Sequence, residues 1–482
     1  IGAMRPCRER GCNSEEFLLT FAEAAFDDEQ DDVANAAIGE GVTRYPESPR
    51  FANLLGEHEL EMGRVEAATL AFQQAITVDP KFVPAYRNLA KARARAGRMS
   101  EAAEVLQRGV SEVPTSVELL LDLADVQVEQ RDLGGAESTL RNAIRIDGRN
   151  VKAQRDLGRV LERLDRFQDA VGVLAGLQER GVLDREGTLC LGRSYLALGQ
   201  SDKARSVLAK LHSEDSKDAD ASSEYGRALG EAGDVKAAES VLDAVILEHP
   251  QNALSHYYRG ILMVRLDRFR EAVDSFQTAS NLKPRDPAIR LSLARAQLAV
   301  ATPESRRDAR QQLDTVIAAY NRDEVPSDSW DADAWALRGR MLLEDEKYPQ
   351  ALKDFEAALV VAPTRIDVLV DAGRAQYEMS RFDDAVPLFR KVLDRDARNP
   401  DAHYYLGRIS VRKGDTKAAL KSFEAAVERD PARHPDAHRM LGMIYRDLRL
   451  SAQARKAFLR YLQYVPTGPE AEEVRQLLAR MN

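Results

Sequence analysis

Small residues at a fixed spacing constrain the fold of this chain more than any other feature. Alanine or glycine occurs every 34 residues from Ala22 to Ala294, and the series resumes at Gly339. Twelve residues after most members comes an alanine, and four residues beyond it a large apolar side chain such as Phe72 or Phe276. A small residue lets two helices approach closely, and the large one fills the adjacent groove. The pattern predicts repeated helix pairs that bury their apolar faces against their neighbours. The first series consists of Ala22, Gly56, Ala90, Ala124, Gly158, Gly192, Gly226, Gly260, Ala294, Gly339, Gly373, Gly407 and Gly442.

Turn and stop signals divide each unit into two helices. Gly or Asp often lies between them, as in Gly97-Arg98 and Gly414-Asp415, and prolines such as Pro114 end many second helices. Proline does so because it cannot continue the helical hydrogen-bond ladder. In spacing and residue types the units resemble the tetratricopeptide repeat, a helix–turn–helix motif of 34 residues, over residues 15 to about 468. The resemblance implies a right-handed superhelix whose first helices line a concave face, where partner proteins usually lie.

The expected fold is therefore an all-α solenoid of thirteen antiparallel helix pairs. The ninth pair carries eleven extra residues, and we interpret eight of them as a loop that would hinge the array. The last segment has apolar residues at helical spacing, and a terminal repeat needs such a cover. The sequence predicts a flexible tail at 1–14 that begins with an expression remnant, pairs one to nine at 15–323, the loop at 324–331, pairs ten to thirteen at 332–468 and a capping helix at 469–482.

Composition excludes several classes of protein. A net charge of -9 and a pI near 5.6 argue against a nucleic-acid binder, because phosphate binding requires a basic surface. No run approaches the roughly 18 apolar residues of a membrane span, so we expect no direct membrane insertion. Cys190 fits a core position, whereas Cys7 and Cys12 form at most half a zinc site or a redox pair, and their role stays open. We expect a cytoplasmic protein, or a periplasmic or envelope-associated one if a signal was removed.

The sequence carries no pattern of catalytic residues. None of the common hydrolase, metalloprotease, dinucleotide or phosphate-loop motifs occurs. Three of the seven histidines, His256, His403 and His438, occupy the same helical position, which indicates a structural role. We therefore expect no enzyme, no cofactor and no metal site.

Arginine recurs on the expected inner face, directly after the small residue in seven of the thirteen units. One interpretation is an internal salt-bridge ladder, because acidic residues recur at the matching place in the following unit. The other is an acidic partner, since guanidinium groups bind carboxylates bidentately. We favour the ladder, although Arg227 supports the partner because Leu254 stands where its acid would be. The candidate ladder pairs are Arg159–Glu186, Arg193–Asp220, Arg340–Asp367, Arg374–Asp401 and Arg408–Asp436.

The predicted groove begins acidic, with Glu23 and Glu57, and becomes rich in arginine further on. The Lys/Asn pair that the chaperone-binding subset of this family uses is absent, since Asn53 is followed by Glu57. Three tyrosines on inward positions are either interface anchors or ordinary packing between adjacent helices. The candidate partner-binding residues are Arg87, Lys91, Arg95, Arg155, Arg159, Arg193, Arg227, Arg295, Tyr257, Arg340, Arg374, Tyr377, Tyr404 and Arg408, with Arg163 beside them.

These features favour a non-catalytic scaffold that binds one or more proteins, or acidic peptide segments, in its groove. A second hypothesis is an assembly or polarity factor of a bacterial envelope, pilus or motility system, in some cases recruited by a small GTPase. A third is the regulatory arm of an enzyme whose catalytic domain lies elsewhere. The last two rest on family analogy alone.

Overall fold

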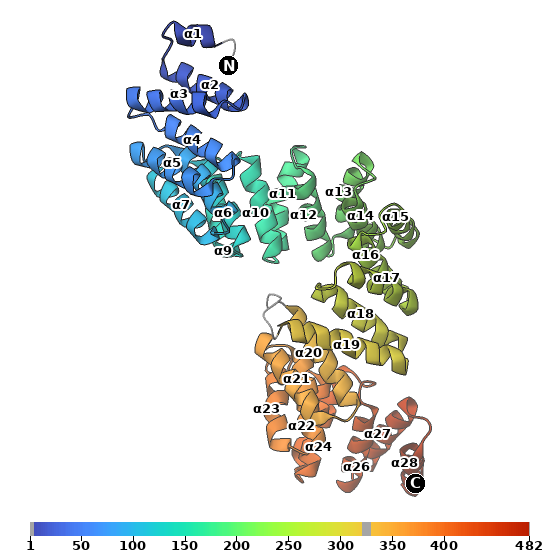
Figure 1. Ribbon diagram of the computed structural model, residues 1–482. Coiled ribbons are helices and arrows are strands. Elements are labelled where there is room, and N and C mark those ends of the chain that lie inside the picture. The colour runs from blue at the N-terminus through green and yellow to red at the C-terminus, as the bar shows by residue number, and fades with distance from the viewer. Residues whose placement is uncertain (1–3, 321–328, 482) are drawn as a thin grey trace. The chain divides into compact units, whose positions relative to one another are not determined.

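The computed structural model describes residues 4–320 and 329–481, which contain 28 α-helices and no strand. All thirteen predicted helix pairs are present, so the all-α fold is confirmed (Figure 1). The first helices of the pairs are α2 (Glu15–Asp27), α4 (Arg50–Glu61), α6 (Val83–Arg95), α8 (Val117–Glu129), α10 (Val151–Arg163), α12 (Arg185–Ala197), α14 (Ala219–Glu231), α16 (Ala253–Arg265), α18 (Pro287–Val300), α20 (Ser329–Glu344), α22 (Ile366–Glu378), α24 (Pro400–Arg412) and α26 (Pro435–Asp447).

The chain divides into two compact bodies, Ile1–Pro250 and Gln251–Asn482, which we call the N-terminal and C-terminal bodies.

The second helices alternate with the first along the chain. The second helices are α3 (Asp31–Arg44), α5 (Val65–Val78), α7 (Met99–Glu112), α9 (Leu133–Ile146), α11 (Phe167–Glu179), α13 (Ser201–Glu214), α15 (Val235–Glu248), α17 (Phe269–Leu282), α19 (Pro303–Tyr320), α21 (Tyr348–Val361), α23 (Phe382–Leu393), α25 (Thr416–Arg429) and α27 (Ser451–Tyr464).

A left-handed residue joins the two helices of most pairs. At the end of α6, Gly97 has a φ of 75°, and the next N–H, of Arg98, donates to the carbonyl of Arg93 over 2.9 Å. This bond satisfies a helix-terminal carbonyl that would otherwise lack a partner. Arg131 takes the same conformation after α8 with a φ of 63°, at a cost of about 1 kcal/mol that glycine avoids. The tight turn folds the second helix back along the first.

The predicted small-to-large contact is the joint of each pair. A Cβ added to Gly56 would lie 2.5 Å from the ring of Phe72, and one added to Gly407 would lie 2.8 Å from Phe423. Both rings are completely buried. The absent side chain is therefore what lets the ring of the second helix reach the backbone of the first.

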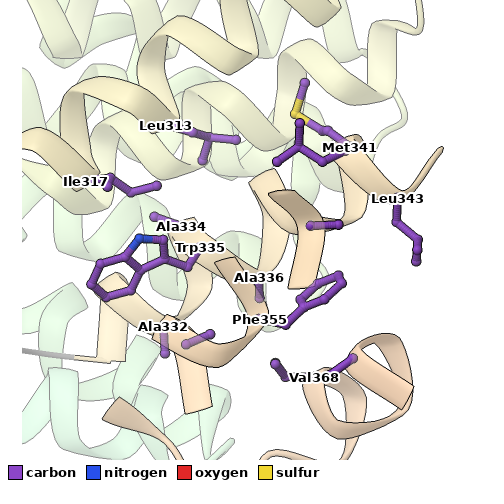
Figure 2. Close-up of a cluster of buried hydrophobic side chains, with 14 of the residues drawn as sticks. Leu313, Ile317, Ala332, Ala334, Trp335, Ala336, Met341, Leu343, Phe355 and Val368 are labelled. Atoms are coloured by element: carbon purple, nitrogen blue, oxygen red, sulfur yellow. The ribbon is translucent and has the colours of Figure 1, made fainter. Parts of the chain in front are cut away.

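A shared apolar cluster joins the ninth and tenth pairs (Figure 2). Leu313 and Ile317 of α19 and Trp335 of α20 belong to it, and the rings of Tyr320 and Trp335 meet edge to face, 4.8 Å apart. The predicted loop at 324–331 lies outside the described residues, apart from its last three positions, where α20 begins. The hinge at this loop stays a prediction.

The two ends of the chain carry different covers. At the C-terminus, α28 (Pro469–Arg480) packs against α27 and buries Ala471 and Val474, so the capping helix is confirmed. At the N-terminus, where the sequence predicts a flexible tail, a short helix, α1 (Arg5–Glu9), precedes α2; the flexibility of this tail stays a prediction.

Two contacts and a covalent bond hold α1. Arg8 donates to Glu40 of α3 over 2.5 Å, and its guanidinium lies 5.6 Å from the ring centre of Phe21. Cys7 and Cys12 form a disulfide, which answers the open question about these thiols: they bond to each other and leave no thiolate for zinc.

Candidate partner-binding face

The first helices of neighbouring pairs contact each other directly within each body. In the N-terminal body α4 packs on α6, α6 on α8 and α10 on α12, and in the C-terminal body α18 packs on α20 and α22 on α24. Every extensive contact between alternate helices in the described residues joins two first helices. The first helices therefore lie on the inner side of each stack, since elements on the inner side of a curve approach one another most closely.

Two adjoining hollows lie along this inner face in the N-terminal body. The first lies against α4, α6 and α8 and has a volume of about 420 Å³. The second lies against α8 and α10, has a volume of about 290 Å³, and shares Asp125 with the first. Arg87, Lys91 and Arg159, predicted from the sequence, are thus brought to one surface. The polar residues that line the two hollows are Glu57, Arg87, Asn88, Lys91, Asp122, Asp125, Glu129, Asp156, Arg159 and Arg163.

Charges in these hollows are only partly neutralised by the chain itself. Arg87 donates two hydrogen bonds to Asp122, of 2.5 and 3.2 Å, and Lys152 donates one to Asp125 over 3.1 Å. Lys91 and Arg163 are exposed, and neither forms an ion pair with another described residue. Two cations on this face are consequently available to a binding partner.

An amide network joins α4 to α6 beside the first hollow. Asn88 donates to Glu57 over 2.7 Å and to Asn53 over 3.1 Å, and Asn53 in turn donates to Glu57 over 3.1 Å. In the sequence, Asn53 and Glu57 showed only that the Lys/Asn pair of the chaperone-binding subset is absent. No sequence pattern predicted a role for Asn88. The network fixes these side chains, because each amide has a defined acceptor.

Two other candidate arginines are bound to the chain itself. Arg95 donates to the carbonyl of Leu60 over 3.3 Å, and Arg155 reaches Asp184 over 2.5 Å and Asp156 over 3.0 Å. Burial raises the pKa of Asp184, but hydrogen bonds from the Gly187 N–H and from Arg155 outweigh it and hold that pKa below its usual range. Arg155 thus helps to hold the start of α12.

Part of the predicted salt-bridge ladder is present. Arg159 lies 2.9 Å from Glu186 in the N-terminal body, and Arg340 lies 2.6 Å from Asp367 in the C-terminal body. Arg340 also contacts Asp371 over 2.6 Å. Arg295, one pair earlier, lies 2.8 Å from Asp333. At these positions the guanidinium groups link one helix pair to the next.

Arg193 and Arg227 share a carboxylate that the sequence did not indicate. Arg193 donates to Glu224 of α14 over 2.6 Å, and Arg227 lies 3.8 Å from the same carboxylate. Glu224 is only 1% exposed. The expectation that Arg227 lacks a partner is therefore wrong. Its acid is Glu224, one turn earlier on the same helix, and the sequence comparison considered only acids in the following unit.

The last two predicted ladder pairs are not formed. Asp401 is bound by Arg433 at 3.1 Å and by His434 at 2.7 Å instead of by Arg374. Asp436 is bound by Arg439 at 2.7 Å and accepts from the Tyr404 hydroxyl at 3.2 Å instead of pairing with Arg408. The predicted pairs Arg374–Asp401 and Arg408–Asp436 are wrong, because nearer cations reach both acids first.

The three candidate tyrosines pack against neighbouring rings. Tyr377 and Tyr404 are 5% and 7% exposed, and Tyr404 stacks on His434 with 4.0 Å between ring centres. Tyr257 is half-buried, 5.7 Å from the ring of Phe276. This geometry agrees with the packing alternative, and two of these side chains offer little surface to a partner.

The Cys190 thiol and the Ser222 hydroxyl, two reactive groups elsewhere in the described chain, are buried. Cys190 lies in the core as predicted, and burial raises the pKa of its thiol, which keeps it protonated. The Ser222 hydroxyl lies 2.7 Å from Nδ1 of His212, but Ser222 is 0% exposed and donates to the carbonyl of Ser216. This contact closes a turn and leaves no accessible nucleophile. Among the described residues, no helix has the length and apolar character needed to cross a membrane.

Two family models, both described as the tetratricopeptide repeat, match this chain. One matches residues 19–81, 121–181, 370–432 and 410–470, and the other matches residues 59–123 and 195–259. The first set of matches lies in both bodies, and nearly all of the second lies in the N-terminal body.

Individual relatives are more distant. The chain is 24% identical over 180 residues to the mitochondrial import receptor subunit TOM70 of Homo sapiens, which is 37% of this chain and 29% of that protein. It is 22% identical over 131 residues to the protein CTR9 homolog of Arabidopsis thaliana, which is 27% of this chain and 12% of that protein. The chain thus matches less than a third of the length of these relatives.

Solved structures resemble the chain over much of its length. A chain in the crystal structure of the APC/C hetero-tetramer Cut9-Hcn1 aligns with 99% of this chain and 98% of its own length, at a TM-score of 0.45 and 12% identity. The human IFIT1 dimer with m7Gppp-AAAA aligns over 78% of this chain and 89% of its own, at a TM-score of 0.47 and 16% identity.

Proposed function

Because the chain belongs to the tetratricopeptide repeat family, we propose that it is a non-catalytic scaffold that binds partner proteins along its first helices. Repeats of this family serve as protein-interaction scaffolds. Stacked repeats suit this role since they offer an extended surface that no single globular domain provides. The similarity of one segment to a subunit named as an import receptor agrees with a role in protein recognition.

The observation that carries the proposal is the pair of adjoining hollows along α4, α6, α8 and α10. They are concave, they combine apolar walls such as Leu106 and Val160 with polar groups, and they share Asp125. Concave surfaces with a few fixed polar groups are the usual form of binding sites. Lys91 and Arg163 supply cations that form no ion pair with another described residue, which favours a partner with acidic groups on the docked surface.

The test begins with a partner identified by co-purification from the native organism and mass spectrometry. Its affinity is then measured for the wild type and for the double variant Lys91→Glu and Arg163→Glu. We expect binding to weaken by about tenfold or more, since like charges then meet across the interface. Circular dichroism checks that the helix content is unchanged, as expected for two exposed side chains without internal ion pairs.

A matched control reverses one lysine and one arginine away from the hollows. Lys236 on α15 and Arg180 after α11 are both exposed and form no ion pair with a described residue. The variant Lys236→Glu and Arg180→Glu changes the net charge by the same amount and should bind like the wild type. An equal loss in both variants, or no loss in either, would refute the inner face as the docking surface. Turnover of a substrate by the purified chain would refute the non-catalytic part.

A further inference from the structure

Two neighbouring arginines in the C-terminal body break the pattern that their equivalents follow. Arg159, Arg193 and Arg340 each lie within 2.9 Å of a carboxylate. Arg374 on α22 and Arg408 on α24 occupy the same position in consecutive first helices, yet neither forms an ion pair with a described carboxylate. Since α22 packs directly on α24, the two guanidinium groups belong to adjacent parts of one inner face.

The missing counter-charges are present in the sequence but are bound elsewhere. The acids in register with these arginines are Asp401 and Asp436. Arg433 and His434 bind Asp401 at 3.1 and 2.7 Å, and Arg439 binds Asp436 at 2.7 Å. With these acids bound by other cations, Arg374 and Arg408 lie on the inner face without an ion pair to any described carboxylate.

Aromatic contacts fix one of these two groups in place. The guanidinium carbon of Arg408 lies 5.0 Å from the ring centre of Tyr377 and 5.7 Å from that of Tyr404. Its one described hydrogen bond goes to the Tyr404 hydroxyl at 3.4 Å. Stacking on aromatic rings orients a guanidinium group and leaves its N–H donors at the edge available. Because its conformation is already restricted, Arg408 loses less conformational entropy when its N–H groups bind an acceptor.

We propose that Arg374 and Arg408 form a site that binds a short acidic segment of a protein partner, with side-chain carboxylates meeting the two guanidinium groups. This proposal rests on the proposed function and adds the chemistry of the ligand and a second location. A guanidinium group binds a carboxylate through two parallel hydrogen bonds. A long polyanion such as nucleic acid is repelled by the net charge of -9 of the whole chain. A short acidic stretch meets only the local field, which salt screens beyond about 8 Å at physiological ionic strength.

One acidic side chain of the same face opposes the ligand. Glu378 lies one turn after Arg374 on α22, is exposed, and forms no ion pair with a described residue. Its charge repels an incoming carboxylate. Neutralising it in the variant Glu378→Gln should therefore strengthen binding of the peptide. A general effect of net charge would not depend on which acidic residue is neutralised.

The experiment measures fluorescence polarisation of a labelled peptide that carries a run of glutamates, with the full chain as the binder. A peptide with glutamines in the same places is the ligand control. We expect the glutamate peptide to bind, the glutamine peptide not to bind, and the affinity to fall as salt is raised. The double variant Arg374→Gln and Arg408→Gln should bind about tenfold more weakly or worse.

The matched control removes two arginines from second helices of the same body. Arg270 on α17 and Arg310 on α19 are exposed and form no ion pair with a described residue, so Arg270→Gln with Arg310→Gln changes the net charge equally. It should bind the peptide like the wild type. If the glutamine substitutions disturb folding, Arg374→Lys with Arg408→Lys retains both charges but loses the bidentate geometry, and should still weaken binding.

Three results would overturn the proposal: undiminished binding by the Arg374 and Arg408 variant, equal binding of the glutamine peptide, or displacement of the peptide by inorganic phosphate at a lower concentration than by unlabelled glutamate peptide. The last would assign the pair to phosphate groups. These results would not refute the proposed docking surface along α4 to α10, because that surface is tested separately with variants of Lys91 and Arg163.

Discussion

At the scale of single residues, arginines at one repeat position perform different tasks. Arg159 reaches Glu186, and both side chains are about half exposed, at 49% and 55%. Arg193 reaches Glu224, whose side chain is 1% exposed. An exposed pair contributes about 0–1 kcal/mol, whereas a buried carboxylate that loses its partner costs considerably more. The burial of the acid therefore decides how much stability each arginine provides.

A stability comparison separates these two roles. Arg193→Leu removes the 2.6 Å contact to the buried carboxylate of Glu224, so we expect a loss of about 2 kcal/mol in the free energy of unfolding. Arg159→Leu should cost at most about 1 kcal/mol. Urea denaturation followed by circular dichroism measures both. Equal losses would show that the burial of Glu224 does not govern the effect, and a binding experiment with Arg193 variants would have to correct for this loss.

At the scale of helices, the joint of each pair that carries glycine at the small position depends on the missing side chain. A Cβ on Gly158 of α10 would lie 2.5 Å from Leu174 of α11, a distance that real side chains do not adopt. Gly172 also lies inside α11, but a Cβ there would have nothing within 4 Å. The same residue type thus serves close approach at one place and only weakens the helix at the other.

These two glycines should respond to alanine in opposite directions. Gly158→Ala should destabilise the chain by about 1–3 kcal/mol, because Leu174 must move within a packed core. Gly172→Ala should stabilise it by about 0.5–1 kcal/mol, because alanine is the better helix former. Thermal or urea denaturation of the two single variants provides the check. Stabilisation by both substitutions would contradict the close joint between α10 and α11.

At the scale of the whole molecule, stability is built from contacts between neighbours. Within each body, helices contact those one or two places away along the chain. In such an array the ends open independently of the middle, and an end needs a cover. At the C-terminus this cover is α28, whose Val474 packs on the cluster that contains Phe458 and Tyr461.

Removing residues 469–482 tests this local behaviour. The loss of contacts from Val474 and Leu477 should lower the stability of α26 and α27 by about 3 kcal/mol, at about 1.5–3 kcal/mol for each buried apolar side chain. Hydrogen exchange followed by mass spectrometry should show faster exchange in these two helices and unchanged rates from α2 to α14. Faster exchange along the entire chain would instead indicate one cooperative block.

Several features followed from the sequence alone. The spacing of Gly56, Gly407 and their equivalents determined the helix pairs, because close approach and groove filling need specific residue sizes at specific intervals. The final apolar segment determined the cap around Val474. These are local properties, since each depends on residues less than two helices apart in the chain.

Only the tertiary structure decided which charges stay free. Arg193, Arg227, Arg374 and Arg408 look alike in the sequence. A comparison by repeat assigned an acid to Arg374 and to Arg408 that neither of them pairs with, and it assigned none to Arg227, which lies near Glu224. An ion pair forms with an opposite charge that lies close in space, and that charge can come from the same helix, the next pair or a connecting turn. The disulfide between Cys7 and Cys12 and the hollows beside Asp125 were decided in the same way, because they depend on distances that the fold alone sets.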